Sequence, residues 1–186
     1  MGCMSNPTNP LSETQWAAID KRILRADEDR WISSRYAGAS ERRALIALYA
    51  LAYELARVRL VVTEEGLGLI RFQWWRDAVS EIEAGKVREH DVAKALKEEI
   101  DAGRLKPGAL HKLIDGYQGA FEAEDRSLEP EAWLALTAAN VLTPIHDWAE
   151  EIRDVAPYFS AARRSDSKAF GPILTPAPKP IRPAIA

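Results

Sequence analysis

The sequence contains a single cysteine, Cys3, among 186 residues. One cysteine supports neither an intramolecular disulfide nor a cysteine-rich metal site, so we expect a reducing compartment, with the cytoplasm as the location. No uninterrupted apolar stretch approaches the roughly 18 residues of a membrane span, which argues against a transmembrane segment and leaves only peripheral membrane contact. The net charge of -3 argues against nucleic-acid binding through bulk electrostatics. A nucleophile elbow, a phosphate loop and a Rossmann glycine pattern are also missing.

A strand pattern is missing as well, and the periodicities that are present are helical. Ser12 and Gln15 have the spacing of a capping box, which predicts the start of the first helix. Over residues 40–62, apolar residues recur at intervals of three and four, which predicts one apolar stripe along a long helix. A second helix is expected over residues 67–84, packed antiparallel against the first across a short turn.

The remainder of the chain predicts further helices and an extended tail. Residues 91–100 favour a short helix, and Pro107 suits the first turn of the helix after it. A last helical segment is expected over residues 130–152, with a kink at Pro144. Five prolines fall between residues 172 and 183, which favours an extended conformation. The expected division is a disordered leader, a helical domain and a proline-rich tail, at residues 1–11, 12–160 and 161–186.

Several blocks in the first half of the chain follow the order of a known family. They read DR at 29–30, RYA at 35–37, ERRAL at 41–45, LYA at 48–50, ELARVR at 54–59 and GLIRFQWWRDA at 68–78. The last block is the most specific, because a double tryptophan between two arginines is unlikely to recur there by chance. The chain resembles the squalene/phytoene synthase family from about residue 27 to residue 85. Within that family it is most similar to the divergent branch that contains the mitochondrial complex I assembly factor.

The resemblance implies an all-α fold, a helical bundle like the N-terminal part of the isoprenoid synthase fold in truncated form. Enzymes of this family join two prenyl diphosphates, and magnesium ions held by two acidic motifs neutralise the leaving group. Aligning Tyr49 and Ala50 with the family's Tyr-Ala pair places the first motif at Ala56 and Leu60, and the adjacent arginine at Tyr53. The second motif falls on a late helix that this shorter chain is expected to lack. The resemblance therefore implies no metal site, no catalytic residue and no cofactor.

The resemblance also carries over residues that bind substrate in the family. The candidates are Arg30, Tyr49, Glu54, Arg71, Trp75 and Arg76. Arg71 and Arg76 could grip a diphosphate or form ordinary surface pairs, and Glu54 could pair with an arginine such as Arg71. Trp74 and Trp75 point about 100° apart on a helix, so one of them is expected in the core. We expect Arg71 and Trp75 to face a cavity or groove between the two long helices.

The expected function follows from the loss of the acidic motif. We expect a catalytically degenerate member of the family, a pseudoenzyme that binds a partner protein as an assembly factor does, or an isoprenoid lipid. The alternative is a prenyltransferase of isoprenoid or carotenoid biosynthesis, in which a second subunit supplies the missing acidic helix and magnesium is the cofactor. A third interpretation is a truncated relic whose shortened bundle exposes apolar surface.

Overall fold

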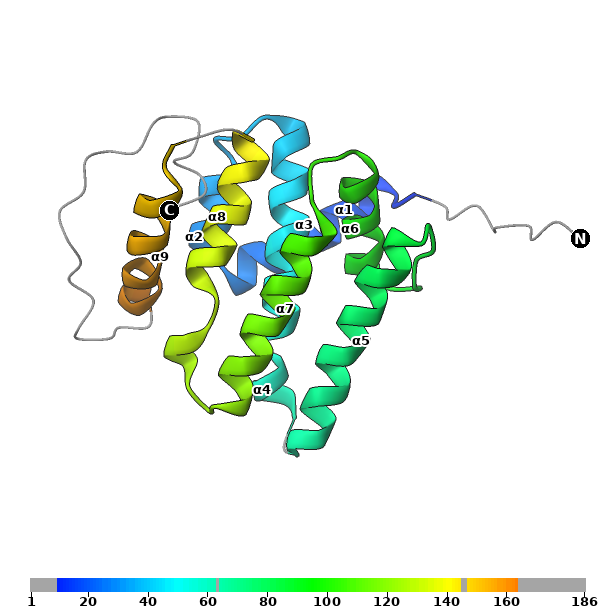
Figure 1. The fold of residues 1–186 in the computed structure, drawn as a ribbon. Coiled ribbons are helices and arrows are strands. Elements are labelled where there is room, and N and C mark those ends of the chain that lie inside the picture. The colour runs from blue at the N-terminus through cyan, green and yellow to red at the C-terminus, as the bar shows by residue number, and fades with distance from the viewer. Residues whose placement is uncertain (1–9, 63, 145–146, 164–186) are drawn as a thin grey trace, which may run out of the picture.

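The computed structural model describes residues 10–62, 64–144 and 147–163, and within these ranges all regular structure is helical (Figure 1). The elements are α1 (Glu13–Ala26), α2 (Glu28–Ser34), α3 (Ala39–Ala56), α4 (Val58–Val61), α5 (Glu65–Glu83), α6 (Asp91–Asp101), α7 (Pro107–Glu122), the 3-10 helix η1 (Arg126–Leu128), α8 (Glu131–Leu142) and α9 (Ala149–Arg163). The expected all-α fold is confirmed. In the described part of the chain, no helix has the length and apolarity needed to cross a membrane.

Helix α1 begins at the capping box that the sequence indicates. The Ser12 hydroxyl accepts a hydrogen bond from the backbone N–H of Gln15 at 3.3 Å, and the Gln15 side chain accepts one from Ser12 N–H at 2.9 Å. Leu11 is buried and its N–H donates to Glu98 at 2.6 Å, so ordered contacts reach into the expected leader. The remainder of that leader, residues 1–9, lies outside the described residues.

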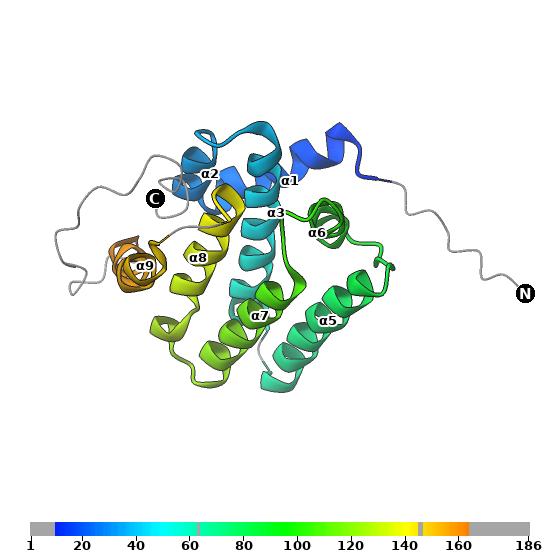
Figure 2. The same ribbon diagram turned by 45° about the horizontal axis from the view of Figure 1, so that its top comes forward.

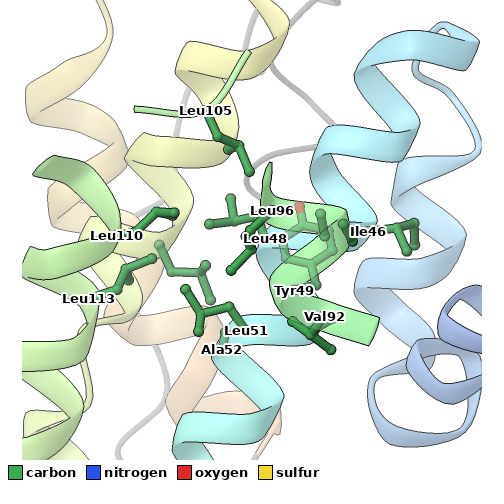
Figure 3. Packing of buried hydrophobic residues seen from close by; sticks show 14 of the residues in the cluster. Ile46, Leu48, Tyr49, Leu51, Ala52, Val92, Leu96, Leu105, Leu110 and Leu113 are labelled. Atoms are coloured by element: carbon green, nitrogen blue, oxygen red, sulfur yellow. The ribbon is translucent and has the colours of Figure 1, made fainter. Parts of the chain in front are cut away.

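Helix α3 lies at the centre of the bundle, packed against α1, α2, α6, α7 and α8 (Figure 2). Every residue from Ala44 to Ala52 is buried, so this helix is covered all round and not along one stripe as its periodicity indicated. Leucines of α3, α6 and α7 lie together in the core, namely Leu48, Leu51, Leu96 and Leu113 (Figure 3). Each fully buried leucine contributes roughly 2 kcal/mol of hydrophobic stabilisation.

The helix expected over residues 40–62 is divided, because α3 ends at Ala56 and Arg57 separates it from α4. The expected antiparallel packing of the two long helices is wrong. Helix α5 packs mainly against α7, and α7 packs in turn on α3 (Figures 1 and 2). Helix α5 can pack closely on α7 because Gly68 has no side chain at the contact. A Cβ at Gly68 would lie 2.3 Å from the Phe121 ring, so only glycine allows this close approach.

The expected kink at Pro144 is a complete break between two helices. Helix α8 ends at Leu142, and the next residue, Thr143, has an extended conformation, as the residue before a proline prefers. Helix α9 begins at Ala149, packs chiefly on α8 and continues to Arg163, past the expected end of the domain at residue 160. Residues 164–186 of the expected tail lie outside the described residues.

Candidate functional site

A cavity of about 230 Å³, here called the central pocket, opens between α2, α3, α7 and the segment from η1 to α8. The residues that line it are Ala26, Asp27, Arg30, Tyr49, Ala52, Tyr53, Ala56, Tyr117, Arg126, Glu129 and Glu131. Charged side chains and tyrosines make up most of this lining, and the apolar part consists of alanines. Two of the residues expected to bind substrate, Arg30 and Tyr49, meet here.

Two carboxylates hold Arg30 in the wall of the central pocket. Asp27 is the N-cap of α2, where one carboxylate oxygen accepts the backbone N–H of Arg30 at 3.2 Å and the other accepts Nη1 at 2.7 Å. Nη2 donates to the carboxylate of Glu131, in the first turn of α8. The guanidinium carbon lies 5.8 Å from the centroid of the Tyr49 ring.

The charge of Arg30 is stable and already balanced. Burial alone would lower the pKa of its guanidinium, but the negative charges of Glu131 and Asp27 outweigh burial and raise the pKa above its ordinary value. The side chain is 19% exposed, and that of Glu131 is 11% exposed. Arg30 is therefore a permanent cation whose charge two neighbouring anions neutralise.

Tyr117 of α7 is a buried phenol in the same pocket. Burial raises the pKa of Tyr117 well above its ordinary value, and the negative charge of Glu131 raises it further, whereas the positive charge of Arg30 opposes the shift. The phenol therefore stays protonated at physiological pH. It can donate a hydrogen bond but cannot serve as a base.

The rim of the central pocket near η1 repeats this pairing of opposite charges. Glu129 Oε1 lies 3.5 Å from Arg59 Nη2 and 3.5 Å from Arg126 Nε. The Glu129 side chain is only 6% exposed, while that of Arg126 is 59% exposed. Each carboxylate that lines the pocket thus lies beside an arginine, and Arg126 is the arginine of the lining most open to solvent.

Ala56 lines the central pocket at one of the two positions where the resemblance places the first acidic motif. Leu60, at the other position, is 79% exposed and does not line the pocket. Neither side chain offers an oxygen to a hard cation. Across the described residues, no group of three or more His, Cys, Asp or Glu side chains is placed to hold a metal ion.

Glu54 of α3 lies outside the central pocket and pairs with α1. Its carboxylate is 3.4 Å from Arg22 Nη1 and 4.0 Å from Arg57 Nη1. Glu54 therefore pairs with arginines as expected, but the example named from the sequence, Arg71, is not one of them. Arg71 is on α5, which does not pack on α3, so the nearest cations come from α1 and from α3's own end.

The three candidates on α5 are divided between the surface and the core. Arg71 is exposed, and Arg76 donates two hydrogen bonds to Asp115 of α7, at 3.0 and 2.7 Å. Trp75 is buried, with its ring centroid 5.2 Å from that of His90, so one tryptophan of the pair is core as expected. The expectation that Arg71 and Trp75 face one cavity between α3 and α5 is wrong, because these helices do not pack together. Their part in binding a ligand stays a prediction.

Sequence reasoning missed several residues of the central pocket, namely Asp27, Tyr117, Arg126, Glu129 and Glu131. Asp27 has a local signal, since an aspartate three residues before Arg30 suits the N-cap of a helix that carries the arginine in its first turn. Glu131 has none: it is 101 residues from Arg30 and meets it only because α8 packs on the same central helix.

Comparison with known proteins agrees with this architecture. Residues 23–142 match the family model described as squalene/phytoene synthase. The chain is similar to NADH dehydrogenase (ubiquinone) complex I, assembly factor 6, at 30% identity for the proteins of Homo sapiens and Bos taurus and 31% for that of Rattus norvegicus. Each alignment spans 93 residues, which is 50% of this chain but only 28% of the relative's length. No solved structure matches the chain significantly.

Proposed function

The chain belongs to the squalene/phytoene synthase family, and we propose that it is a catalytically degenerate member that acts by binding a partner protein. The names of its relatives describe an assembly factor of NADH dehydrogenase complex I. This chain aligns with little more than a quarter of those relatives, so an assembly-factor-like role is our extension to it.

The observation that carries this proposal is the neutralised state of Arg30. A diphosphate needs cations that are free to receive its charge, preferably through forked hydrogen bonds. In the central pocket, Nη1 and Nη2 of Arg30 are already used by Asp27 and Glu131. An incoming diphosphate would meet a cation whose charge the two carboxylates already balance, and its own charge would be repelled by them.

The residues of the central pocket also do not fit a magnesium cluster. Magnesium prefers several oxygen ligands in octahedral geometry, usually carboxylates shared with a phosphate. Ala56 and Leu60 provide none, and Asp27, Glu129 and Glu131 each lie beside an arginine that competes for their oxygens. We therefore propose no cofactor and derive no catalytic step through a metal.

The character of the pocket supports a protein partner over an isoprenoid lipid. Small-molecule sites usually measure roughly 300–1,000 Å³ and are mostly apolar. The central pocket measures about 230 Å³ and is lined mainly by charged residues and tyrosines. We also propose a cytoplasmic location, with at most peripheral membrane contact.

The decisive experiment is titration calorimetry of the protein with a non-hydrolysable farnesyl diphosphate analogue, with and without magnesium. We expect no heat of binding in either buffer. We also expect millimolar magnesium to leave the melting temperature unchanged, because an ion stabilises the native state only if it binds that state. Magnesium-dependent binding of the analogue would overturn the proposal and favour a prenyltransferase, completed by a second subunit.

A further inference from the structure

Four large apolar side chains are exposed where α4 meets α5. Leu60 and Val61 of α4 are 79% and 44% exposed, and Leu67 and Ile70 of α5 are 51% and 65% exposed. We call these four residues the α4–α5 corner. Figures 1 and 2 place it at one end of the bundle, with α5 at the edge of the molecule. Exposed apolar groups that cluster in this way are typical of an interaction surface.

The apolar surface continues from the α4–α5 corner along one side of α5. Leu67, Ile70 and Trp74 follow one another at intervals of three and four residues, so they lie on the same side of the helix. Trp74 is half-buried, whereas the α7-facing side of α5, which carries Phe72 and Val79, is fully buried. Leu67 and Ile70 are exposed on this side, and the apolar surface ends at Trp74, where the Arg88 guanidinium carbon lies 5.0 Å from the centroid of the ring. The exposed Arg71 flanks this surface.

An acidic hollow of about 360 Å³ adjoins the α4–α5 corner. It is lined by Arg59, Val62, Glu64, Glu65, Phe121, Glu122 and Glu124. The one cation of this lining, Arg59, is paired with Glu129 outside the hollow. Within the described residues, none of the four glutamates of the hollow pairs with a lysine, an arginine or a histidine.

The apolar α4–α5 corner and the acidic hollow beside it together indicate what kind of molecule would bind there. Apolar side chains of the occupant would cover the α4–α5 corner, and lysine or arginine side chains beside them would enter the hollow. An amphipathic helix presents both kinds of group at the required spacing of three and four residues. We propose that the α4–α5 corner and the acidic hollow together form the docking surface for a basic amphipathic helix of a partner protein.

The charge of the hollow argues against two other occupants. The cytoplasmic face of a membrane carries anionic lipids, which four glutamates would repel. A second copy of this chain, related by a two-fold axis, would bring a second set of these four glutamates into the same interface and would supply no surplus of cations from the surface itself. A cationic protein segment avoids both repulsions. This inference rests on the proposed function, because it names the kind of partner that such a protein would bind.

The test uses the whole 186-residue chain and a fluorescein-labelled peptide of leucine and lysine, about five helical turns long, and measures binding by fluorescence anisotropy. We expect the peptide to bind, and to bind more weakly as salt increases. The same peptide with glutamate in place of lysine is expected not to bind. Replacing Glu122→Lys together with Glu124→Lys should weaken binding at least about tenfold, as should Ile70→Ser. Lysine suits the C-terminal end of α7, so the charge variant should still fold.

Matched variants control for net charge and for apolar area. Glu151→Lys with Asp154→Lys makes the same change of charge on exposed positions of α9, and Ile32→Ser removes an exposed isoleucine from α2. Both should bind the peptide within about twofold of the unaltered protein. An equal loss of peptide affinity in the two charge variants would mean that the peptide is attracted to any acidic surface. The proposed docking surface would then be wrong.

Other occupants have their own outcomes in this experiment. Binding of anionic vesicles that depends on Ile70 and not on Glu122 would assign the surface to a membrane. Displacement of the probe by a synthetic peptide of residues 164–186 would assign it to this chain's own basic C-terminal segment. Either result would overturn the proposal that the surface binds a helix of a partner protein. A further outcome is that the diphosphate analogue binds with magnesium while peptide binding is still weakened by Ile70→Ser. In that case the proposed function fails and the proposed docking surface stands.

Discussion

Arg30 has a charge that the fold accommodates through two carboxylates from different helices. Moving a guanidinium out of water is costly unless opposite charges and hydrogen bonds compensate for the lost hydration. Asp27 supplies compensation from the same helix, and Glu131 supplies it from α8. The three side chains therefore depend on one another, and removing the cation leaves two partly buried anions close together.

We predict that Arg30→Met lowers the free energy of unfolding by about 3 kcal/mol, because it leaves Glu131 and Asp27 without their cation. The double variant Arg30→Met with Glu131→Met should recover part of that loss, since it replaces the pair of Arg30 and Glu131 with apolar groups and leaves only Asp27 without its cation. Urea unfolding of the two variants measures both values. A loss below about 1 kcal/mol in the single variant would show that the carboxylates remain well solvated.

At the scale of elements, the contact between α5 and α7 determines the shape of one half of the bundle. Gly68 lets the backbone of α5 approach the Phe121 ring, which itself lies 5.6 Å from the Phe72 ring between centroids. A larger residue at position 68 would push α5 away from α7 and move the α4–α5 corner with it. The position of the proposed docking surface therefore depends on one glycine.

We predict that Gly68→Ala lowers the free energy of unfolding by about 1–3 kcal/mol, because the added methyl group would overlap the Phe121 ring. Gly119→Ala is the matched control, since a Cβ at Gly119 of α7 would meet nothing within 4 Å. That variant should gain about 0.5–1 kcal/mol from the better helix propensity of alanine. Equal effects of the two substitutions, measured by urea unfolding, would contradict the close approach of the helices.

For the molecule as a whole, α3 is packed among many helices, whereas α9, among the described helices, packs closely on α8 alone. Helix α3 packs against α1, α2, α4, α6, α7 and α8, whereas α9 packs chiefly on α8 and contains Pro157 inside its sequence. Proline removes one backbone hydrogen bond from a helix and clashes with the preceding turn. The two helices should therefore differ in local stability.

We predict that the backbone amides of α9 exchange with deuterium at least about a hundredfold faster than those of α3, because α9 can open without disrupting the central core. Hydrogen exchange followed by mass spectrometry on peptides from residues 149–163 and 39–56 measures this difference. Similar protection in both regions would mean that α9 unfolds only together with the whole bundle.

The success of prediction from sequence varied with the range of the interactions involved. The helix starts at Ser12 and Pro107 are confirmed, because capping and proline preferences act within one turn. The packing of α5 on α3 was wrongly expected, since periodicity indicates that a helix has an apolar face and does not indicate which helix covers it. In the central pocket, Arg30 and Tyr49 were expected, but their acidic partners were not.

Local sequence is therefore sufficient to place most of the helices and, with the family's motif blocks, to identify the family and the all-α fold. The state of Arg30 and the exposure of the α4–α5 corner depend on tertiary packing. Arg30 meets Glu131 across 101 residues of sequence, and Leu60 is 79% exposed although it follows a buried helix. Side-chain charge and burial depend on neighbours in space, and those neighbours are brought together only when distant helices pack.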